Sequence, residues 1–123
     1  ANALSKIDNA ERAGKIEVII SPISKQIKAV LSILKKEGYI EDFEVTSEAR
    51  GGQIRVALSR NINRVGAIKP RFPVKFDDLE KFEKSYLPAK DFGRIIMSTP
   101  QGMITQIEAR KKRTGGVLIA YVY

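Results

Sequence analysis

Hydrophobic residues in the first part of the chain recur with two different periods, which predicts a mixture of helices and strands. Leu4, Ile7 and Ala10 recur at every third position, so we expect a short helix that ends at Gly14. Residues 16–20 alternate with strand period, which predicts a strand directly after that helix.

A second helix is predicted to start at Ser21-Pro22 and to end before Gly38. A serine hydroxyl is a good helix cap, and proline fits the first turn because its missing N–H would have no partner there. The apolar residues between these signals share one helical face: Ile27, Val30, Leu31 and Leu34. Strands at 39–46 and 53–59 follow, joined by a hairpin turn at Arg50-Gly51-Gly52. This order predicts an αβαββ unit with its helices on one face of a small mixed sheet.

Short strands dominate the second half. Gly66, Pro70 and Pro73 interrupt regular structure between the two halves, so we place a boundary there, between subdomains 1–62 and 63–123. The elements expected beyond it are a short strand ending at residues 74–76, a helix capped by Asp77 and reaching Tyr86, strands at 95–99, 103–105 and 117–123, and a short basic helix at 106–113. The predicted fold class is mixed α+β, with a strand-rich C-terminal subdomain that carries short helices.

Composition excludes several classes of function. The 123 residues contain no cysteine and no histidine, which rules out disulfides, Cys/His zinc sites, thiol nucleophiles and imidazole bases. No apolar run approaches the roughly 18 residues of a membrane helix, and no charged segment followed by an apolar one opens the chain. We therefore expect no membrane partner and a cytoplasmic location.

The carboxylates do not form a ready catalytic pair. Asp77 and Asp78 are neighbours and point in different directions. Glu80 and Glu83 lie one turn apart on a predicted helix, where we expect solvated charges beside lysines. Since no glycine-rich phosphate loop is present either, the sequence predicts no enzyme, no metal and no cofactor. An RNA-modifying or hydrolytic enzyme is the alternative that these absences oppose.

Basic residues are the stronger signal. The net charge is +8, and residues 61–123 hold twelve basic and six acidic side chains, against ten and eight in residues 1–60. Such charge points to a polyanion, because lysine and arginine neutralise phosphates without reading sequence. Two clusters stand out, one around the subdomain boundary and one run at 110–113. They contain Arg60, Arg64, Lys69, Arg71 and Lys75, and then Arg110, Lys111, Lys112 and Arg113.

Two further segments suit nucleic acid. Ser98-Thr99-Pro100-Gln101-Gly102 fits a type I turn at a hairpin tip, and its short hydroxyl side chains can enter an RNA minor groove and bond 2′-OH groups. An ordinary hairpin turn is the alternative. Ser24-Lys25 lies in the first turn of the second helix, where phosphate is attracted. The alternative there is capping by Ser21 with Lys25 simply exposed.

Short segments along nearly the whole chain also match one known family in order. Those in the first half are Ala1-Asn2-Ala3-Leu4, Ile7 with Asn9-Ala10, Pro22 with Ser24-Lys25, Gly38-Tyr39-Ile40 and Phe43-Glu44. Those in the second half are residues 66–75, Leu87-Pro88-Ala89, Phe92-Gly93, residues 98–102, Glu108-Ala109, Gly115-Gly116 and residues 120–123. On these matches the chain resembles the universal small-subunit ribosomal protein family numbered eight, in its archaeal and eukaryotic cytosolic branch.

The resemblance implies a structural ribosomal protein of two small α/β subdomains. It implies direct binding to the central domain of small-subunit rRNA early in assembly, beside neighbouring small-subunit proteins, and a monomer off the ribosome. The loop at 98–102 would enter an RNA minor groove, although this chain has Pro100 where the family usually has a hydroxyl residue. A translational repressor that binds a structured mRNA site through the same surface is the alternative. The expected RNA-binding residues are Asn2, Ser5, Asn9, Lys25, Arg64, Lys69, Arg71, Ser98, Thr99, Gln101, Gly102, Lys111 and Lys112.

Overall fold

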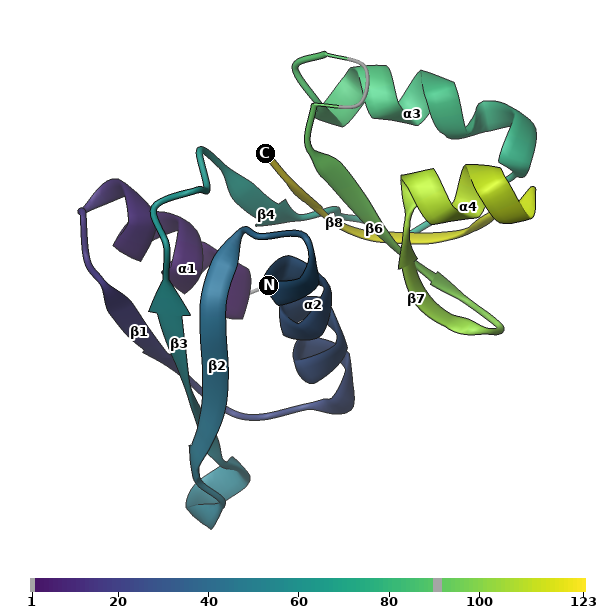
Figure 1. Ribbon diagram of the computed structural model, residues 1–123. Coiled ribbons are helices and arrows are strands. Elements are labelled where there is room, and N and C mark those ends of the chain that lie inside the picture. Colours follow the sequence, from purple (N-terminus) through teal and green to yellow (C-terminus); the bar gives the residue numbers. More distant parts are fainter. Residues whose placement is uncertain (1, 90–91) are drawn as a thin grey trace. The chain divides into compact units, whose positions relative to one another are not determined.

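The computed structural model describes residues 2–89 and 92–123. The chain divides into two compact units, Ala1–Arg64 and Val65–Tyr123, called here the N-terminal and C-terminal units (Figure 1). Each unit combines helices with an antiparallel sheet of its own, so the predicted mixed α+β class is confirmed.

The N-terminal unit has the predicted αβαββ order. Its elements are α1 (Asn2–Arg12), β1 (Glu17–Ile20), α2 (Lys25–Lys36), β2 (Ile40–Ser47), the 3-10 turn η1 (Ala49–Gly51) and β3 (Gln53–Leu58). Strand β3 is central and runs antiparallel to β1 on one side and to β2 on the other. Figure 1 shows α1 and α2 on the same side of this sheet.

Alternation along β3 explains why one face of this sheet is covered. Ile54 and Val56 are fully buried, whereas Arg55 between them is exposed. The helices cover the buried face with residues such as Ile7 and Leu34, neither of which has exposed surface. Burying a side chain of this size contributes about 1.5–3 kcal/mol, so these contacts hold the helices on the sheet.

The start of α2 differs from the prediction. Ser24 caps the helix, because its Oγ accepts a 3.1 Å hydrogen bond from the backbone N–H of Ile27. Ser21 lies outside the helix, so the predicted cap was wrong. The physical reason is a tertiary contact: the N–H of Ile23 donates to the carbonyl oxygen of Gly51 at 2.8 Å and holds this segment against the turn between β2 and β3.

The C-terminal unit contains a larger sheet with two short helices. Its elements are β4 (Val65–Ala67), β5 (Pro73–Val74), the 3-10 turn η2 (Phe76–Asp78), α3 (Leu79–Tyr86), β6 (Arg94–Thr99), β7 (Gly102–Thr105), α4 (Gln106–Lys112) and β8 (Gly116–Val122). The strand order is β4-β8-β6-β7, and β5 also pairs with β8. Leu79, Leu87 and Ala109 pack from the helical side onto buried residues of β6 and β8, which forms one core.

Two predictions for this unit need correction. Gly66 lies inside β4 and Pro73 begins β5, so neither interrupts regular structure as predicted. Gly66 pairs with Tyr121 of β8. A Cβ atom at this position would lie 2.7 Å from the Tyr121 hydroxyl, so glycine lets the tyrosine pack over the strand. Asp77 is not a cap, because it lies in η2 and α3 begins only at Leu79. Short segments of this kind carry too little periodicity to set their bounds.

Candidate nucleic-acid interface

The β6–β7 hairpin presents the predicted tip. Thr99 pairs with Gly102 at the end of the two strands, which leaves Pro100 and Gln101 at the turn. Both turn residues and Gly102 are exposed, whereas Ser98 and Thr99 are half-buried. Gly102 has a φ of +118°, a backbone conformation that glycine adopts without strain.

The Thr99 hydroxyl already holds this turn. It donates to the Gly102 carbonyl oxygen at 2.8 Å and accepts from the Gln101 backbone N–H at 3.2 Å. A hydroxyl has one proton and two lone pairs, so one lone pair remains for another partner. Thr99 can therefore accept a hydrogen bond from RNA without giving up the turn, but it cannot donate one as well.

A hollow of about 450 Å³ lies beside the hairpin tip. Its lining surface is mostly apolar, and two hydroxyl residues and one lysine are among the residues that line it. The lining residues are Pro73, Val74, Lys75, Ser98, Thr99, Pro100, Gly116 and Val117. From the sequence, Lys75 was identified only as one cation of the boundary cluster, and Gly116 and Val117 were not identified as site residues. Their strand pairings bring them here, because β8 pairs with both β5 and β6, and such long-range pairing leaves no local signal.

Close packing fixes the distance between β8 and the hairpin. A Cβ atom at Gly116 would lie 2.6 Å from the Ser98 carbonyl oxygen and 3.0 Å from Thr99 Cγ2. Real Cβ atoms essentially never approach backbone oxygen so closely, so glycine is required for space at this position. The hairpin tip is thus supported by an inflexible backbone contact.

The four-residue basic run does not act as a unit. Lys111 and Lys112 are exposed in the last turn of α4. Arg110 turns inward, and its Nη1 donates to Glu83 Oε1 of α3 at 2.6 Å. Arg113 ends the helix in a left-handed conformation, with its guanidinium carbon 5.3 Å from the centre of the Phe76 ring. Arg110 and Arg113 therefore make contacts within the C-terminal unit, whereas Lys111 and Lys112 face solvent.

Buried polar contacts hold α4 in place. Gln106 has no exposed surface, and its Oε1 accepts from the Ile95 N–H at 2.7 Å while its Nε2 donates to the Gly93 carbonyl oxygen at 3.3 Å. Glu83 is only 3% exposed, so the expectation of a solvated carboxylate at this position was wrong. Because Gln106 and Arg110 are one helical turn apart on the buried face, Lys111 and Lys112 are left outside.

The boundary cations differ in their exposure and in their contacts with the N-terminal unit. Arg64 Nε donates to Asp8 Oδ1 at 3.3 Å, and the Asp8 side chain is only 10% exposed, so this pair serves the N-terminal unit. Arg60 donates to the Gly14 carbonyl oxygen at 2.8 Å, at the end of α1. Lys69 and Arg71 are exposed on the segment between β4 and β5.

The predicted residues of the N-terminal unit lie on its helices. Asn2, Ser5 and Asn9 are spaced by three and four positions on α1, which puts them on one helical face. Ser5 and Asn9 are exposed, and the side chain of Asn2 lies outside the described part of the structure. Lys25 is the first residue of α2 and is exposed beside the Ser24 cap.

The outer face of the N-terminal sheet carries paired charges instead. Arg55 on β3 donates to Glu44 on β2 and, at 3.1 Å, to Glu17 on β1. Its hydrogen bond with Glu44, followed by that with Glu17, raises the pKa of Arg55. At one edge, hydrogen bonding from Lys35 lowers the pKa of Asp42. This face offers phosphates acidic neighbours, so it is a poor RNA surface.

Metal sites and membrane-spanning helices are both absent from the described residues. No group of three or more acidic side chains is placed to hold a metal ion within residues 2–89 and 92–123. None of the helices in the same ranges is long and apolar enough to cross a membrane.

Comparison with known proteins gives a consistent picture. The model of the family described as Ribosomal protein S8 matches residues 1–123. The chain is 49% identical over 122 residues to "Small ribosomal subunit protein uS8" of Thermoplasma acidophilum, an alignment that covers 99% of this chain and 95% of the relative. It is 48% identical, with the same coverage, to the protein of the same name from Thermoplasma volcanium.

Proposed function

The chain belongs to the ribosomal protein S8 family, and we propose that it is a small ribosomal subunit constituent that binds small-subunit rRNA directly. Its location is then the ribosome, and its partners are rRNA and neighbouring ribosomal proteins. The relatives carry the name of a ribosomal protein and not of an enzyme, in keeping with the absence of cysteine and histidine.

The observation that carries the proposal is the hairpin tip of the C-terminal unit. Exposed Gln101 and Gly102 lie at the turn, with the half-buried hydroxyls of Ser98 and Thr99 directly behind them. Lys75 lines the adjacent hollow. Hydroxyl and amide groups of this size match the 2′-OH groups and base edges of a wide RNA minor groove.

One set of residues positions the RNA, and a second set recognises its shape. Lys69, Lys111 and Lys112 are exposed cations, which neutralise phosphates and set orientation without reading sequence. Ser98, Thr99 and Gln101 select the shape of one RNA site. The exposed residues of α1 and Lys25 of α2 supply a second contact from the N-terminal unit, where the start of a helix favours phosphate.

The resemblance of the chain to its family extends the proposal to the central domain of small-subunit rRNA and to an early step of assembly. Pro100 stands where the family usually has a hydroxyl residue. We infer that proline stiffens the turn here, because its ring fixes φ, and so offsets the lost contact.

Binding to a central-domain rRNA fragment, compared with a generic RNA duplex of equal length across a series of salt concentrations, tests this function. We expect tight binding to the fragment and much weaker, steeply salt-dependent binding to the duplex. Equal and steeply salt-dependent binding to both RNAs would mean that net charge alone drives association, and it would refute specific rRNA recognition.

A further inference from the structure

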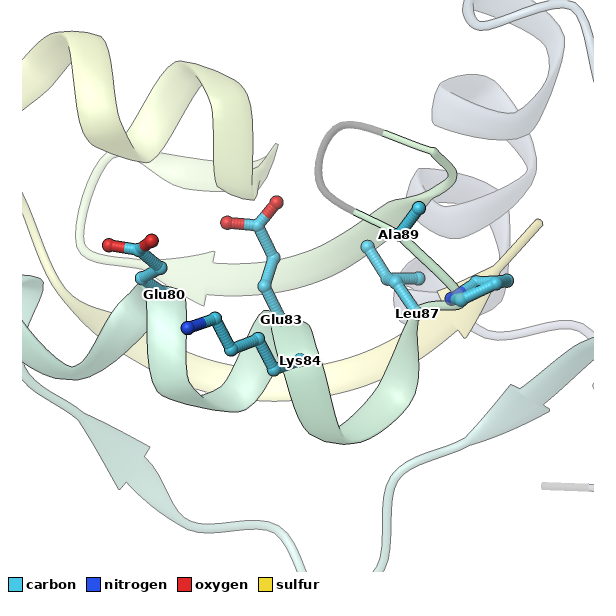
Figure 2. A pocket seen from close by; sticks show the side chains of 6 residues that line it. Glu80, Glu83, Lys84, Leu87 and Ala89 are labelled. Atoms are coloured by element: carbon cyan, nitrogen blue, oxygen red, sulfur yellow. The ribbon is translucent and has the colours of Figure 1, made fainter.

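A second, smaller pocket lies along α3, with lining residues distinct from those of the hairpin hollow. Its volume is about 140 Å³, enough for the end of one side chain. Figure 2 shows its residues, which are Glu80, Glu83, Lys84, Leu87, Pro88 and Ala89. Three of them, from Leu87 to Ala89, form an apolar wall directly after the helix.

Glu83 leaves an unmet hydrogen-bond acceptor at this pocket. The residue is 3% exposed, and its Oε1 is bound by Arg110 at 2.6 Å. Its Oε2 is buried and has no hydrogen-bond partner among the described residues. A buried acceptor without a donor costs free energy, and more so when the group is a carboxylate. A donor that reached Oε2 would recover that cost.

The other charges at the pocket do not meet this need. Glu80 and Lys84 are four positions apart on α3, and Figure 2 shows the Lys84 ammonium on the Glu80 side of the helix. An acidic residue four positions before a lysine is a favourable spacing on a helix, but among the described residues no ion pair or hydrogen bond joins Lys84 to Glu80 or to Glu83 Oε2. The same view shows the Glu83 carboxylate between Glu80 and Ala89, next to the apolar wall.

We propose that this pocket receives one arginine or lysine side chain of a neighbouring protein, whose nitrogen donates to Glu83 Oε2. Charged donors form the strongest hydrogen bonds with carboxylates, and the aliphatic stem of a basic side chain packs along Leu87 and Pro88. RNA is the poorer occupant, because two carboxylates repel its phosphates. The choice of a protein as the source rests on the proposed place in the ribosome, whereas the preference for a cationic donor rests on Glu83 alone.

Methyl NMR of the intact protein, titrated with n-butylguanidinium, tests the chemistry of the pocket. We expect saturable shifts of the Leu87 and Ala89 methyl signals. Neither n-butanol, which has no charge, nor tetramethylammonium, which has no N–H, should produce saturable shifts there. Saturable shifts with either control would overturn the proposal. An absence of saturable shifts with n-butylguanidinium would also overturn it, and this is the result expected if water alone satisfies Oε2.

Variants distinguish a loss of ligand binding at the pocket from a loss of folding. Ala89→Leu fills the pocket from an exposed position and should weaken n-butylguanidinium binding at least about tenfold. Glu83→Gln should do the same, and Asp77→Asn is the matched control, because it removes an equal charge from an exposed residue that does not line the pocket and should leave binding within about twofold. If Glu83→Gln does not fold, Ala89→Leu decides, and wild-type affinity in Ala89→Leu would refute the site.

The source of the side chain is tested in reconstituted small subunits that carry Lys84→p-benzoylphenylalanine. We expect a photo-cross-link to an arginine- or lysine-bearing segment of one ribosomal protein, and its loss when Ala89→Leu is added. A cross-link to rRNA, or one that Ala89→Leu does not change, would refute a protein occupant. Binding of Ala89→Leu to the central-domain rRNA fragment should equal that of the wild type, so failure of rRNA binding and failure of the pocket are distinguishable results.

Discussion

The Thr99 hydroxyl donates a 2.8 Å hydrogen bond to the carbonyl oxygen of Gly102, across the turn that joins β6 to β7. For Ser98, one residue earlier, no side-chain hydrogen bond to any of the described residues is present. Adjacent hydroxyl residues at the hairpin tip therefore have different tasks. Thr99 keeps the shape of the turn, and Ser98 has a hydroxyl available for a partner.

This division predicts different effects of two substitutions. Thr99→Val keeps the branched shape and removes the hydroxyl, so we expect a loss of stability of about 0.5–1.5 kcal/mol together with weaker rRNA binding. Ser98→Ala should weaken binding to the rRNA fragment more than to a generic duplex and should leave stability nearly unchanged. Urea unfolding and RNA titration measure the two effects. Equal losses of binding to both RNAs in Ser98→Ala would exclude a role in recognition.

The pair of Arg110 and Glu83 should contribute more to stability than any surface charge of α4. Arg110→Met leaves Glu83 buried without its cation, and removal of one partner from a buried pair costs about 3 kcal/mol. Lys111→Met, at the next and exposed position, is the control and should change stability by less than about 0.5 kcal/mol. Similar unfolding free energies for the two variants would show that the ion pair does not anchor α4.

Gly116→Ala should disturb the support of the hairpin. The new methyl group would meet the Ser98 carbonyl oxygen at 2.6 Å, so β6 and β8 must separate at this point. We expect a loss of about 1–3 kcal/mol, typical of overpacking, with amide shifts concentrated at Ser98 and Val117. An unchanged unfolding free energy would mean that the strands adapt without strain.

The lowered pKa of Asp42, on β2 of the N-terminal sheet, predicts how the stability of the fold depends on pH. Asp42 accepts hydrogen bonds from Lys35 Nζ at 3.0 Å and from the Phe43 N–H at 2.8 Å, and its pKa is lowered, chiefly by Lys35. A lowered carboxyl pKa favours the folded state at pH values above the ordinary carboxyl pKa, and this contribution fades as the pH falls through the lowered value. Lys35→Met should return the pKa of Asp42 toward its usual range in an NMR titration, whereas Lys36→Met should not. An Asp42 pKa that does not respond to Lys35→Met would contradict the assigned cause.

Salt dependence tests the cations of α4. Lys111→Ala and Lys112→Ala should each reduce the slope of log affinity against log salt by about 1 if each lysine neutralises one phosphate. Affinity for the fragment and for a generic duplex should fall by similar factors. An unchanged slope would place these residues away from RNA.

The regular elements were predictable because their patterns are long or strongly marked. The spacing of Leu4, Ile7 and Ala10 predicted α1, and all three residues are buried. The alternation of Ile54 and Val56 with polar or small residues predicted which face of β3 is buried. Residues 98–102 were correctly predicted as a hairpin tip, because a proline and a glycine stood between two apolar segments.

The errors at Ser21 and Gly66 share a physical cause, which is contact between segments far apart in sequence. Two serines precede α2; Ser24 is the cap, and the bond between Ile23 and Gly51 ties the segment before it to the turn between β2 and β3. The strand at Gly66 exists because β8 is available to pair with it. Lys75 joins the hairpin tip through β5 and β8 in the same way.

Arg110 and Glu83 are a different case, since a local signal was present. Gln106, Ala109 and Arg110 recur at helical spacing, which puts Arg110 on the face that the buried Ala109 shares. Grouping Arg110 with Lys111, Lys112 and Arg113 as one basic cluster ignored this periodicity. A charged residue on an apolar helical face calls for a buried partner, and Glu83 on α3 occupies the corresponding face.

Amide NMR of the intact protein with the central-domain rRNA fragment tests whether the hairpin tip of the C-terminal unit is the RNA-binding surface. We expect large shifts or broadening at Ser98, Gln101, Gly102, Lys75, Lys111 and Lys112, and little change at Arg55 and Glu44 on the outer face of the N-terminal sheet. Changes centred on Arg55 and Glu44, with the hairpin tip unaffected by bound RNA, would contradict this expectation.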